Sequence, residues 1–394
     1  MKHIVIISES SSFPWGMAST SRVKLIARGL MHKGYNVQYI GLRGADVEYS
    51  VDKKRKGQIE GISYLYPGIF SVRSKYWICR RLDDILGKLF SAILLTNLKL
   101  HHKIDLIILY TRNYFVVKYW STIAKILNIK ILLEICEWPI IITNTTNTSL
   151  FCSKAPLIVH GVLPISNFIE DQIEKISIKH GIKIPSYKIP ILIDSGKFPE
   201  SRINKSSADQ LYMLYSGSAS YLSISGLIFD VMVMLKNDGY RYKLVFTGGG
   251  NRDKYKKILD QVKVRKIDDL VEFTGYLEED VLIKKMLNAS VLLAPIPNDL
   301  QTESRFPTKL GYYLACGKPV ITNAFGEAKN YLSDNENVLF VEDFNPNLLK
   351  EKIIYAFNNE EKCQLIGENA RRLAFREFDY KVTFNGFKSF IRQL

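Results

Sequence analysis

Residues 303–327, ESRFPTKLGYYLACGKPVITNAFGE, constrain the fold of this chain more than any other stretch. The apolar run 291–295 precedes them and is short enough to be a buried strand. Pro307 suits the first turn of a helix, where no hydrogen bond is lost, and Gly317 is typical of a helix end. Residues 320–322 then predict a second buried strand. A strand, a helix and a strand in this order predict a parallel α/β domain.

The start of this helix is also a candidate anion site. The first turn of a helix has unpaired amides and the positive end of the helix dipole, and both favour an anion. Arg305 and Lys309 add positive charge beside it. The residues therefore indicate a phosphate site at one end of a parallel sheet.

The same stretch resembles a known family. FPTKLxxYLAxGKPV followed by a Gly-Glu pair resembles the nucleotide-sugar signature of retaining glycosyltransferases with the GT-B fold, family 4 in particular. The resemblance implies an α/β protein with two Rossmann-like, doubly wound parallel-sheet domains facing across a cleft. It implies retaining transfer of a sugar from a nucleotide-diphospho-sugar to a glycan or lipid-linked acceptor, in bacterial cell-surface polysaccharide synthesis. It also implies that no metal and no cofactor is needed beyond the donor substrate.

The length of 394 residues fits two domains, each able to bury its own core. We expect an acceptor-side domain at 1–195, completed by a C-terminal helix at 380–394, and a donor-binding domain at 196–379. Residues 189–194 resemble the last strand of the first domain. The polar, unpatterned residues 199–209 predict the linker.

Composition and charge indicate where the protein is located and which partners it has. Its opening, MKHIVIISES, has too short an apolar core for a signal peptide, and no apolar run approaches the ~20 residues that span a bilayer. Five cysteines without metal-binding spacing indicate reduced thiols, so we expect a cytoplasmic protein. The net charge is +15, and residues 1–195 carry most of it, with 26 Lys and Arg against 14 Asp and Glu. This excess predicts an anionic partner, for which an acidic acceptor and a membrane surface are candidates and nucleic acid is a third. With the resemblance to glycosyltransferases, we expect no nucleic acid.

Residues 77–100 predict a helix with an apolar side and several basic residues around it. Two interpretations stay open. A core helix with one wet side is the more common case. A basic amphipathic helix can instead lie on an anionic membrane surface, which would place the protein peripherally on the inner face of the membrane.

Polar residues at strand ends are the candidate acceptor-binding residues. In related enzymes an E-x-x-E-x-P stretch lines the acceptor side, and here it contains Glu134 and Glu137. Arg112 follows the neighbouring predicted strand 105–110. The carboxyl ends of parallel strands meet at one edge of the sheet, so these residues suit acceptor hydroxyls. The alternative, strand-end charges facing water, stays open for Glu134.

Four glycine-containing or FPTK loops follow the predicted strands of the second domain, and such loops suit donor phosphates. Gly16, in the first strand-to-helix loop, resembles the family's glycine that faces these phosphates, although a plain turn is equally typical. The predicted donor-binding residues are Gly16, Gly217, Ser218, Gly248, Gly249, Gly275, Tyr276, Phe306, Pro307, Thr308, Leu310 and Tyr312. Lys309 is the first candidate for stabilising the leaving diphosphate, Arg305 the second, and Glu303 is a candidate contact of the transferred sugar.

The sequence departs from the family pattern at two places. The family has a ribose-binding glutamate at the position of Tyr312, and its partner glutamate falls on Ser304, next to Glu303. The family also has a basic pair after the first glycine loop, where this chain has Ser218 and Ser225 or their neighbours.

These departures keep a rival hypothesis open, a non-catalytic GT-B subunit that binds a glycan or a partner. A nucleotide-sugar epimerase of similar fold is a third hypothesis, which the FPTK and GKPV residues disfavour. Donor turnover, with and without acceptor, separates the three.

Overall fold

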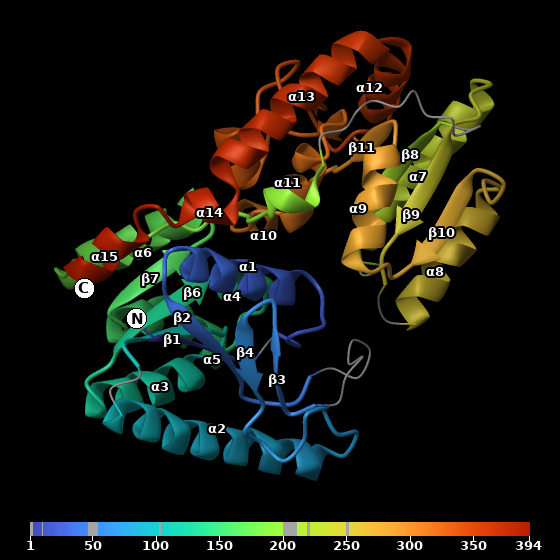
Figure 1. The fold of residues 1–394 in the computed structure, drawn as a ribbon. Coiled ribbons are helices and arrows are strands. Elements are labelled where there is room, and N and C mark those ends of the chain that lie inside the picture. The colour runs from blue at the N-terminus through green and yellow to red at the C-terminus, as the bar shows by residue number, and fades with distance from the viewer. Residues whose placement is uncertain are drawn as a thin grey trace. The chain divides into compact units, whose positions relative to one another are not determined.

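The chain divides into two compact units, Met1–Leu192 with Tyr380–Leu394, and Ile193–Asp379 (Figure 1). The sequence-based boundary fell close by, after residue 195. The structure, a computed structural model, describes residues 3–9, 11–45, 54–101, 104–199, 211–218, 221–249 and 252–394. The predicted linker, apart from residue 199, lies outside these.

The first unit is built on a seven-stranded sheet in the order β3-β4-β2-β1-β5-β6-β7. All neighbouring strands pair in parallel except β3 and β4. The strands are β1 (His3–Ser8), β2 (Asn36–Gly41), β3 (Lys56–Ile59), β4 (Ile62–Leu65), β5 (Leu106–Tyr110), β6 (Lys130–Ile135) and β7 (Gly161–Pro164). The helices are α1 (Ala18–His32), α2 (Trp77–Leu100), α3 (Tyr114–Ile126), α4 (Pro139–Ile142), α5 (Thr146–Lys154), α6 (Asn167–His180), α14 (Tyr380–Thr383) and α15 (Phe387–Gln393).

The C-terminal segment packs into the core of this unit, where the rings of Phe384, Phe387 and Phe390 are buried. The expected single helix over 380–394 is wrong in one respect, because the segment forms two short helices, α14 and α15. Asn385 and Gly386 lie at the break, and both are weak helix formers.

Residues 189–194 do not form the strand that the sequence predicted. The carbonyl groups of Ile189 and Pro190 accept hydrogen bonds from the two terminal nitrogens of Arg22, at 2.7 and 2.8 Å. Proline also has no amide to donate to a neighbouring strand. The amide of Ile189 donates to the carbonyl of Pro164, the last residue of β7, at 2.9 Å, so the segment keeps one backbone contact with the sheet beside the two contacts from Arg22.

The second unit has a six-stranded parallel sheet in the order β10-β9-β8-β11-β12-β13. The strands are β8 (Tyr212–Ser216), β9 (Lys243–Thr247), β10 (Val271–Gly275), β11 (Val291–Leu293), β12 (Val320–Thr322) and β13 (Leu339–Phe340). The helices are α7 (Leu222–Asn237), α8 (Arg252–Val264), α9 (Glu279–Asn288), α10 (Leu300–Glu303), α11 (Thr308–Ala315), α12 (Pro346–Asn358) and α13 (Glu360–Glu377).

This strand order reverses direction between β8 and β11, which are neighbours in the sheet although β9 and β10 separate them in the chain. Open parallel sheets bind ligands outside the carboxyl ends of their strands at such a switch point. The loop after β8 and the segment from β11 to α11 both begin there. The topology therefore places the predicted phosphate residues where a ligand site belongs.

Candidate functional site

Lys309, the second residue of α11, lies at the switch point of the second unit. Its Nζ is 3.3 Å from the carbonyl oxygen of Ser216, the last residue of β8, and 4.1 Å from the ring centroid of Tyr215. Burial lowers the pKa of Lys309 to about 7, and no carboxylate of the described residues counteracts this shift. The side chain still keeps partial contact with solvent. An ammonium group in this situation gains charge stabilisation from a bound anion.

Three predicted glycines join the loops after β8, β9 and β10 through their backbones. The amide of Gly217 donates to the carbonyl of Thr247 at 2.9 Å, and that of Gly248 donates to Gly275 at 2.8 Å. Gly248 has φ of +132°, and a Cβ there would lie 2.0 Å from the carbonyl oxygen of Gly217. Only glycine fits at this position, so the close approach of the loops depends on it.

The start of α11 is exposed in part, whereas the residues around it fill the core. Pro307 and Thr308 are partly exposed at the helix start. Leu310 is fully buried, and the buried ring of Phe306 stacks on Tyr331 with centroids 5.5 Å apart. The side chains of Phe306 and Leu310 are thus closed off from a donor, contrary to expectation, and only their backbone is left to line the site.

Arg305 and Glu303 lie just before α11. One guanidinium nitrogen of Arg305 is 3.5 Å from the hydroxyl of Tyr221, the residue that precedes α7. Glu303 is the last residue of α10 and is partly exposed. The structure therefore keeps both charged groups near the segment that carries Lys309.

The two serines at the positions of the missing basic pair differ in location. Ser218 lies in the loop after β8. Ser225 is buried inside α7, where its hydroxyl donates to the carbonyl groups of Tyr221 and Leu222. Only Ser218 is thus a residue of the predicted phosphate loop.

Gly249 and Tyr276 continue this edge of the sheet beyond β9 and β10. A Cβ on Gly249 would lie 3.6 Å from the Cβ of Tyr276. Tyr276 is 54% exposed, so its ring is accessible to a ligand at this edge of the sheet.

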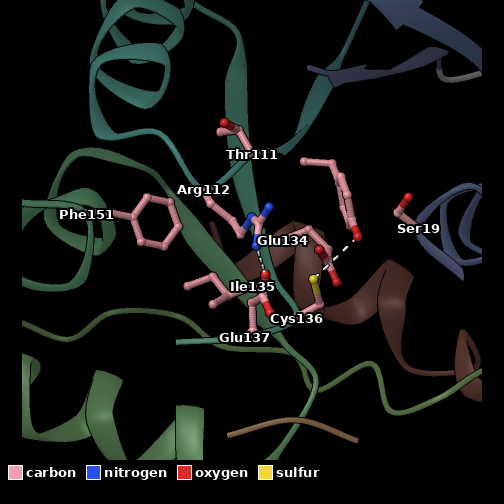
Figure 2. Close-up of a pocket in the computed structure, with 9 residues that line it drawn as sticks. Ser19, Thr111, Arg112, Glu134, Ile135, Cys136, Glu137 and Phe151 are labelled. Atoms are coloured by element: carbon pink, nitrogen blue, oxygen red, sulfur yellow. Dashed lines mark hydrogen bonds and ion pairs between the residues drawn. The ribbon is translucent and has the colours of Figure 1, made fainter. Parts of the chain in front are cut away.

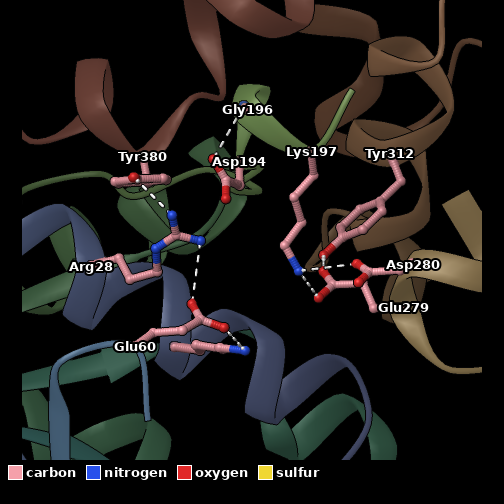
Figure 3. A network of polar contacts seen from close by, with 10 residues as sticks. Arg28, Glu60, Asp194, Gly196, Lys197, Glu279, Asp280, Tyr312 and Tyr380 are labelled. Atoms are coloured by element: carbon pink, nitrogen blue, oxygen red, sulfur yellow. Dashed lines mark hydrogen bonds and ion pairs between the residues drawn. The ribbon is translucent and has the colours of Figure 1, made fainter. Parts of the chain in front are cut away.

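Tyr312 contacts a carboxylate that the sequence did not reveal (Figure 3). Its hydroxyl donates to Oε1 of Glu279 at 2.5 Å. Lys197 pairs with the other oxygen of Glu279 and lies 3.7 Å from Asp280. The ring of Phe198 meets the Tyr312 ring edge to face, with centroids 5.7 Å apart. Family members have a carboxylate on the helix of Tyr312, and here α9 supplies one to the same neighbourhood.

The predicted acceptor residues line a cavity of about 170 Å³ in the first unit (Figure 2). Its lining residues are Ser19, Tyr110, Thr111, Arg112, Glu134, Ile135, Cys136, Glu137 and Phe151. Burial raises the pKa of the Cys136 thiol to about 12, so the thiol stays protonated and is no nucleophile near neutral pH.

Two Arg–Glu pairs give this cavity its charge. Arg22 and Glu134 form a buried pair, with Nε and Oε1 2.5 Å apart. Burial raises the pKa of Glu134, and the charge of Arg22 opposes that shift. Arg112 and Glu137 form the second pair, in which Arg112 is exposed. Glu134 is therefore committed to Arg22, and the Arg112–Glu137 pair is the one open to an incoming molecule.

Gly16 lies in the loop between β1 and α1 of the first unit. A Cβ there would lie 2.2 Å from the Thr20 Oγ1. Close packing within the loop thus accounts for this glycine, and its predicted contact with the donor stays a prediction.

The structure brings Lys309, Gly217, Gly248, Gly275 and Tyr312 to one region of the second unit. It also reveals three residues that sequence reasoning missed. Glu279 gave no signal, because nothing in its local sequence points to Tyr312. Arg22 and Tyr215 gave a weak one, since a charged or polar-tipped side chain among apolar neighbours needs a buried partner.

Similarity to solved structures identifies the fold. Sucrose-phosphate synthase from Thermosynechococcus elongatus superposes with a TM-score of 0.76 at 14% identity, over 100% of this chain and 99% of that one. Anabaena HepE, solved with UDP and glucose, gives 0.69 at 14% identity over 99% of both chains. A lipopolysaccharide outer core galactosyltransferase, WaaB, gives 0.60 at 16% identity over 99% of both. The predicted fold class, that of the GT-B glycosyltransferases, is confirmed.

Sequence comparison adds a family match for the second unit. Residues 197–373 match the family described as Glycosyl transferases group 1. An uncharacterized glycosyltransferase of Methanocaldococcus jannaschii, MJ1178, is 28% identical over 166 residues, which are 42% of this chain and 44% of that protein. The match thus spans less than half of this curated relative. The match covers most of the second unit, and the recognition made from the FPTK stretch is confirmed at the level of a group 1 glycosyl transferase match.

Two searches of the described residues bear on metal and membrane. No group of three or more His, Cys, Asp and Glu side chains among them is arranged to hold a metal ion. None of the described helices is both long enough and apolar enough to cross a bilayer.

Proposed function

We propose that this protein is a retaining glycosyltransferase that transfers a sugar from a nucleotide-diphospho-sugar. The observation that carries the proposal is Lys309, a largely buried ammonium without a carboxylate partner among the described residues, at the switch point of a parallel sheet. A donor diphosphate supplies the negative charge that would pair with this ammonium group. Anabaena HepE was solved with UDP and with UDP-glucose, so UDP-glucose is the first donor to test and UDP the first nucleotide.

In the proposed reaction, the second unit stabilises the diphosphate that leaves the sugar. The bond from the sugar C1 to the diphosphate oxygen breaks, and the acceptor oxygen forms a new bond to C1 on the same face. The acceptor proton passes to the departing phosphate oxygen. Lys309, Arg305 and the amides at the start of α11 then stabilise the charge that develops on the diphosphate. No side chain has to act as a metal ligand in this scheme.

Glu279 is our candidate for the ribose of the donor. A ribose needs a hydrogen-bond acceptor for its hydroxyl groups, and a carboxylate is the strongest one available. Tyr312 and Lys197 hold Glu279 in place, each using one side of the group. The carboxylate that the family carries on α11 is in this proposal replaced by one on α9.

The acceptor belongs in the cavity of the first unit. Its exposed Arg112 and its partner Glu137 offer a donor and an acceptor of hydrogen bonds to a sugar hydroxyl. We propose a glycan or lipid-linked acceptor of bacterial cell-surface polysaccharide synthesis, used on the cytoplasmic face of a membrane.

The test is release of nucleotide from a panel of nucleotide-sugars, with and without candidate acceptors. Turnover that rises with acceptor, and a product whose anomeric configuration equals that of the donor, is the expected result. Donor binding without any turnover would favour the alternative, a non-catalytic GT-B subunit. Conversion of the donor to an isomer would identify an epimerase instead.

A further inference from the structure

Helix α2 (Trp77–Leu100) turns its apolar side to solvent. Large apolar side chains recur along it at helical spacing, and their exposure ranges from 49% for Leu82 and Leu89 to 73% for Leu100. We call this row the α2 face; it consists of Ile78, Leu82, Ile85, Leu89, Ile93 and Leu100.

The opposite side of α2 packs against the unit, and three of its four buried residues are small or polar. Asp83, Gly87, Ser91 and Leu95 are its buried residues. The Asp83 carboxylate accepts a hydrogen bond from the amide of Phe70 at 3.0 Å. A Cβ on Gly87 would lie 2.2 Å from the carbonyl oxygen of Leu42. Helices of globular proteins usually bury their apolar side, so the arrangement here is the reverse of the usual one.

Positive charge surrounds the α2 face. Helix α3 runs beside α2, where the hydroxyl of Tyr119 donates to the carbonyl of Lys88 at 3.4 Å (Figure 1). The basic residues of the two helices are Arg80, Arg81, Lys88, Lys99, Lys118 and Lys125. Their acidic residues are only Asp84 and the buried Asp83. Exposed Phe115 and Ile126 on α3 extend the apolar area.

We propose that α2 and α3 form a docking face for an anionic lipid surface. A helix with an apolar row, flanking Lys and Arg, and a tryptophan at one end has the features of one that lies in the membrane interface. The charge argues against a second copy of this chain as the occupant, because two such faces would repel each other. The face lies in the first unit and does not depend on the proposed catalytic site.

Vesicle cosedimentation tests the apolar row. The protein is mixed with phosphatidylcholine vesicles that contain about 30% phosphatidylglycerol. We expect binding by the wild type, and a loss of about tenfold or more for the double variant Ile85→Gln, Leu89→Gln, because less apolar area is buried. The matched control is Ile178→Gln, Leu365→Gln, which changes two exposed apolar residues of α6 and α13 and is expected to bind like the wild type.

The charges are tested in the same assay. The variant Arg81→Gln, Lys88→Gln, Lys118→Gln is expected to lose about a hundredfold in vesicle affinity, since each cation near such a surface contributes roughly four- to fivefold. Pure phosphatidylcholine, or salt raised to about 500 mM, is expected to weaken wild-type binding in the same direction. The matched control is Lys175→Gln, Lys179→Gln, Lys257→Gln, on exposed positions of α6 and α8.

Tryptophan fluorescence gives a second measurement, which needs no substitution in the α2 face. Trp77, at the start of α2, is 66% exposed, and Trp15 is 41% exposed. Anionic vesicles should shift the emission to the blue in the wild type and in Trp15→Phe, and not in Trp77→Phe.

Two outcomes would overturn the proposal. One is wild-type vesicle affinity in both α2 variants. The other is a dimer in light scattering that Ile85→Gln, Leu89→Gln converts to monomer, which would make the face an interface between copies of the chain.

Discussion

Arg22 in the first unit and Lys309 in the second are both cations that the fold takes largely out of water, but their partners differ. Arg22 pairs with the carboxylate of Glu134 and donates to two backbone carbonyl groups. Lys309 has one carbonyl group at 3.3 Å and the face of the Tyr215 ring. Arg22 thus has a negatively charged partner and two further hydrogen-bond acceptors, whereas Lys309 has only neutral partners among the described residues.

The difference indicates that the charge of Arg22 is structural and that the charge of Lys309 is available to bind a ligand. A buried cation with a carboxylate partner stabilises the fold through that pair, and it has nothing left for a substrate. A buried cation without one is poorly stabilised, and its pKa falls. We infer that Arg22 shapes the cavity of the first unit, whereas Lys309 binds the donor phosphates.

Removing the two charges should affect the free energy of unfolding differently. Arg22→Met leaves the carboxylate of Glu134 buried and unpaired, so we expect the free energy of unfolding to fall by about 3–5 kcal/mol. Lys309→Met replaces a poorly solvated ammonium with an apolar group and should not lower it. Urea denaturation of the two variants checks both. An equal loss in Lys309→Met would mean that Lys309 is structural too.

Glu279→Gln tests the carboxylate that replaces the family's ribose ligand. The wild type should bind a ribonucleotide donor about tenfold or more tighter than its 2′-deoxy analogue, because a hydrogen bond to a charged group contributes about 1.5–3 kcal/mol. The variant should lose most of this preference. The preference itself is the readout, since a merely structural defect would weaken both ligands alike. Glu272→Gln, on an exposed carboxylate of β10 that pairs with Lys285, is the control.

The pKa of Lys309 predicts how donor affinity depends on pH. Only the protonated form attracts phosphate, and in the free protein it is half populated near pH 7 and predominates below it. A bound phosphate raises the pKa, so affinity should be greatest below pH 7 and fall by up to about tenfold per pH unit above it. Calorimetry with an intact nucleotide-sugar, whose phosphates do not titrate in this range, measures the slope. Lys309→Arg should remove the slope, because a guanidinium stays protonated. A slope that persists in Lys309→Arg would assign it to another group.

Tyr312→Phe should have the smallest effect. It keeps the ring against Phe198 and removes the hydroxyl that donates to Glu279. This hydrogen bond to a charged group contributes about 1.5–3 kcal/mol to holding Glu279, but it affects the donor only through the orientation of that carboxylate, so donor affinity should fall by only roughly two- to tenfold. Donor titration of the two proteins decides it, and an unchanged affinity would show that the hydroxyl does not orient Glu279 for the donor.

The sequence predicted what local patterns determine. The apolar runs of β8, β9, β10 and β11, the helix after FPTK, and its end at Gly317 with φ of +68° follow from short-range rules. The loops at the carboxyl ends of the strands follow from the α/β alternation.

The sequence did not predict what distant residues determine. Arg22 and Glu134 lie 112 positions apart, and Tyr312 and Glu279 lie 33 apart, so no local pattern announces either contact. Residues 189–194 are apolar and so predicted a strand, but two of their carbonyl groups accept hydrogen bonds from Arg22 of α1. Leu310 follows Lys309 directly but points into the core, since neighbours on a helix face different directions.

Donor affinity and turnover of Lys309→Met, compared with Lys318→Met, test the central claim most directly. Burial lowers the pKa of both lysines, but Lys318 precedes β12 and so lies at the amino end of the same sheet. The account predicts a loss of about a hundredfold or more in kcat/KM, with weaker donor binding, for Lys309→Met. It predicts values within about threefold of the wild type for Lys318→Met, a difference below 0.7 kcal/mol. Near-normal turnover in Lys309→Met, or equal losses in the two variants, would contradict it.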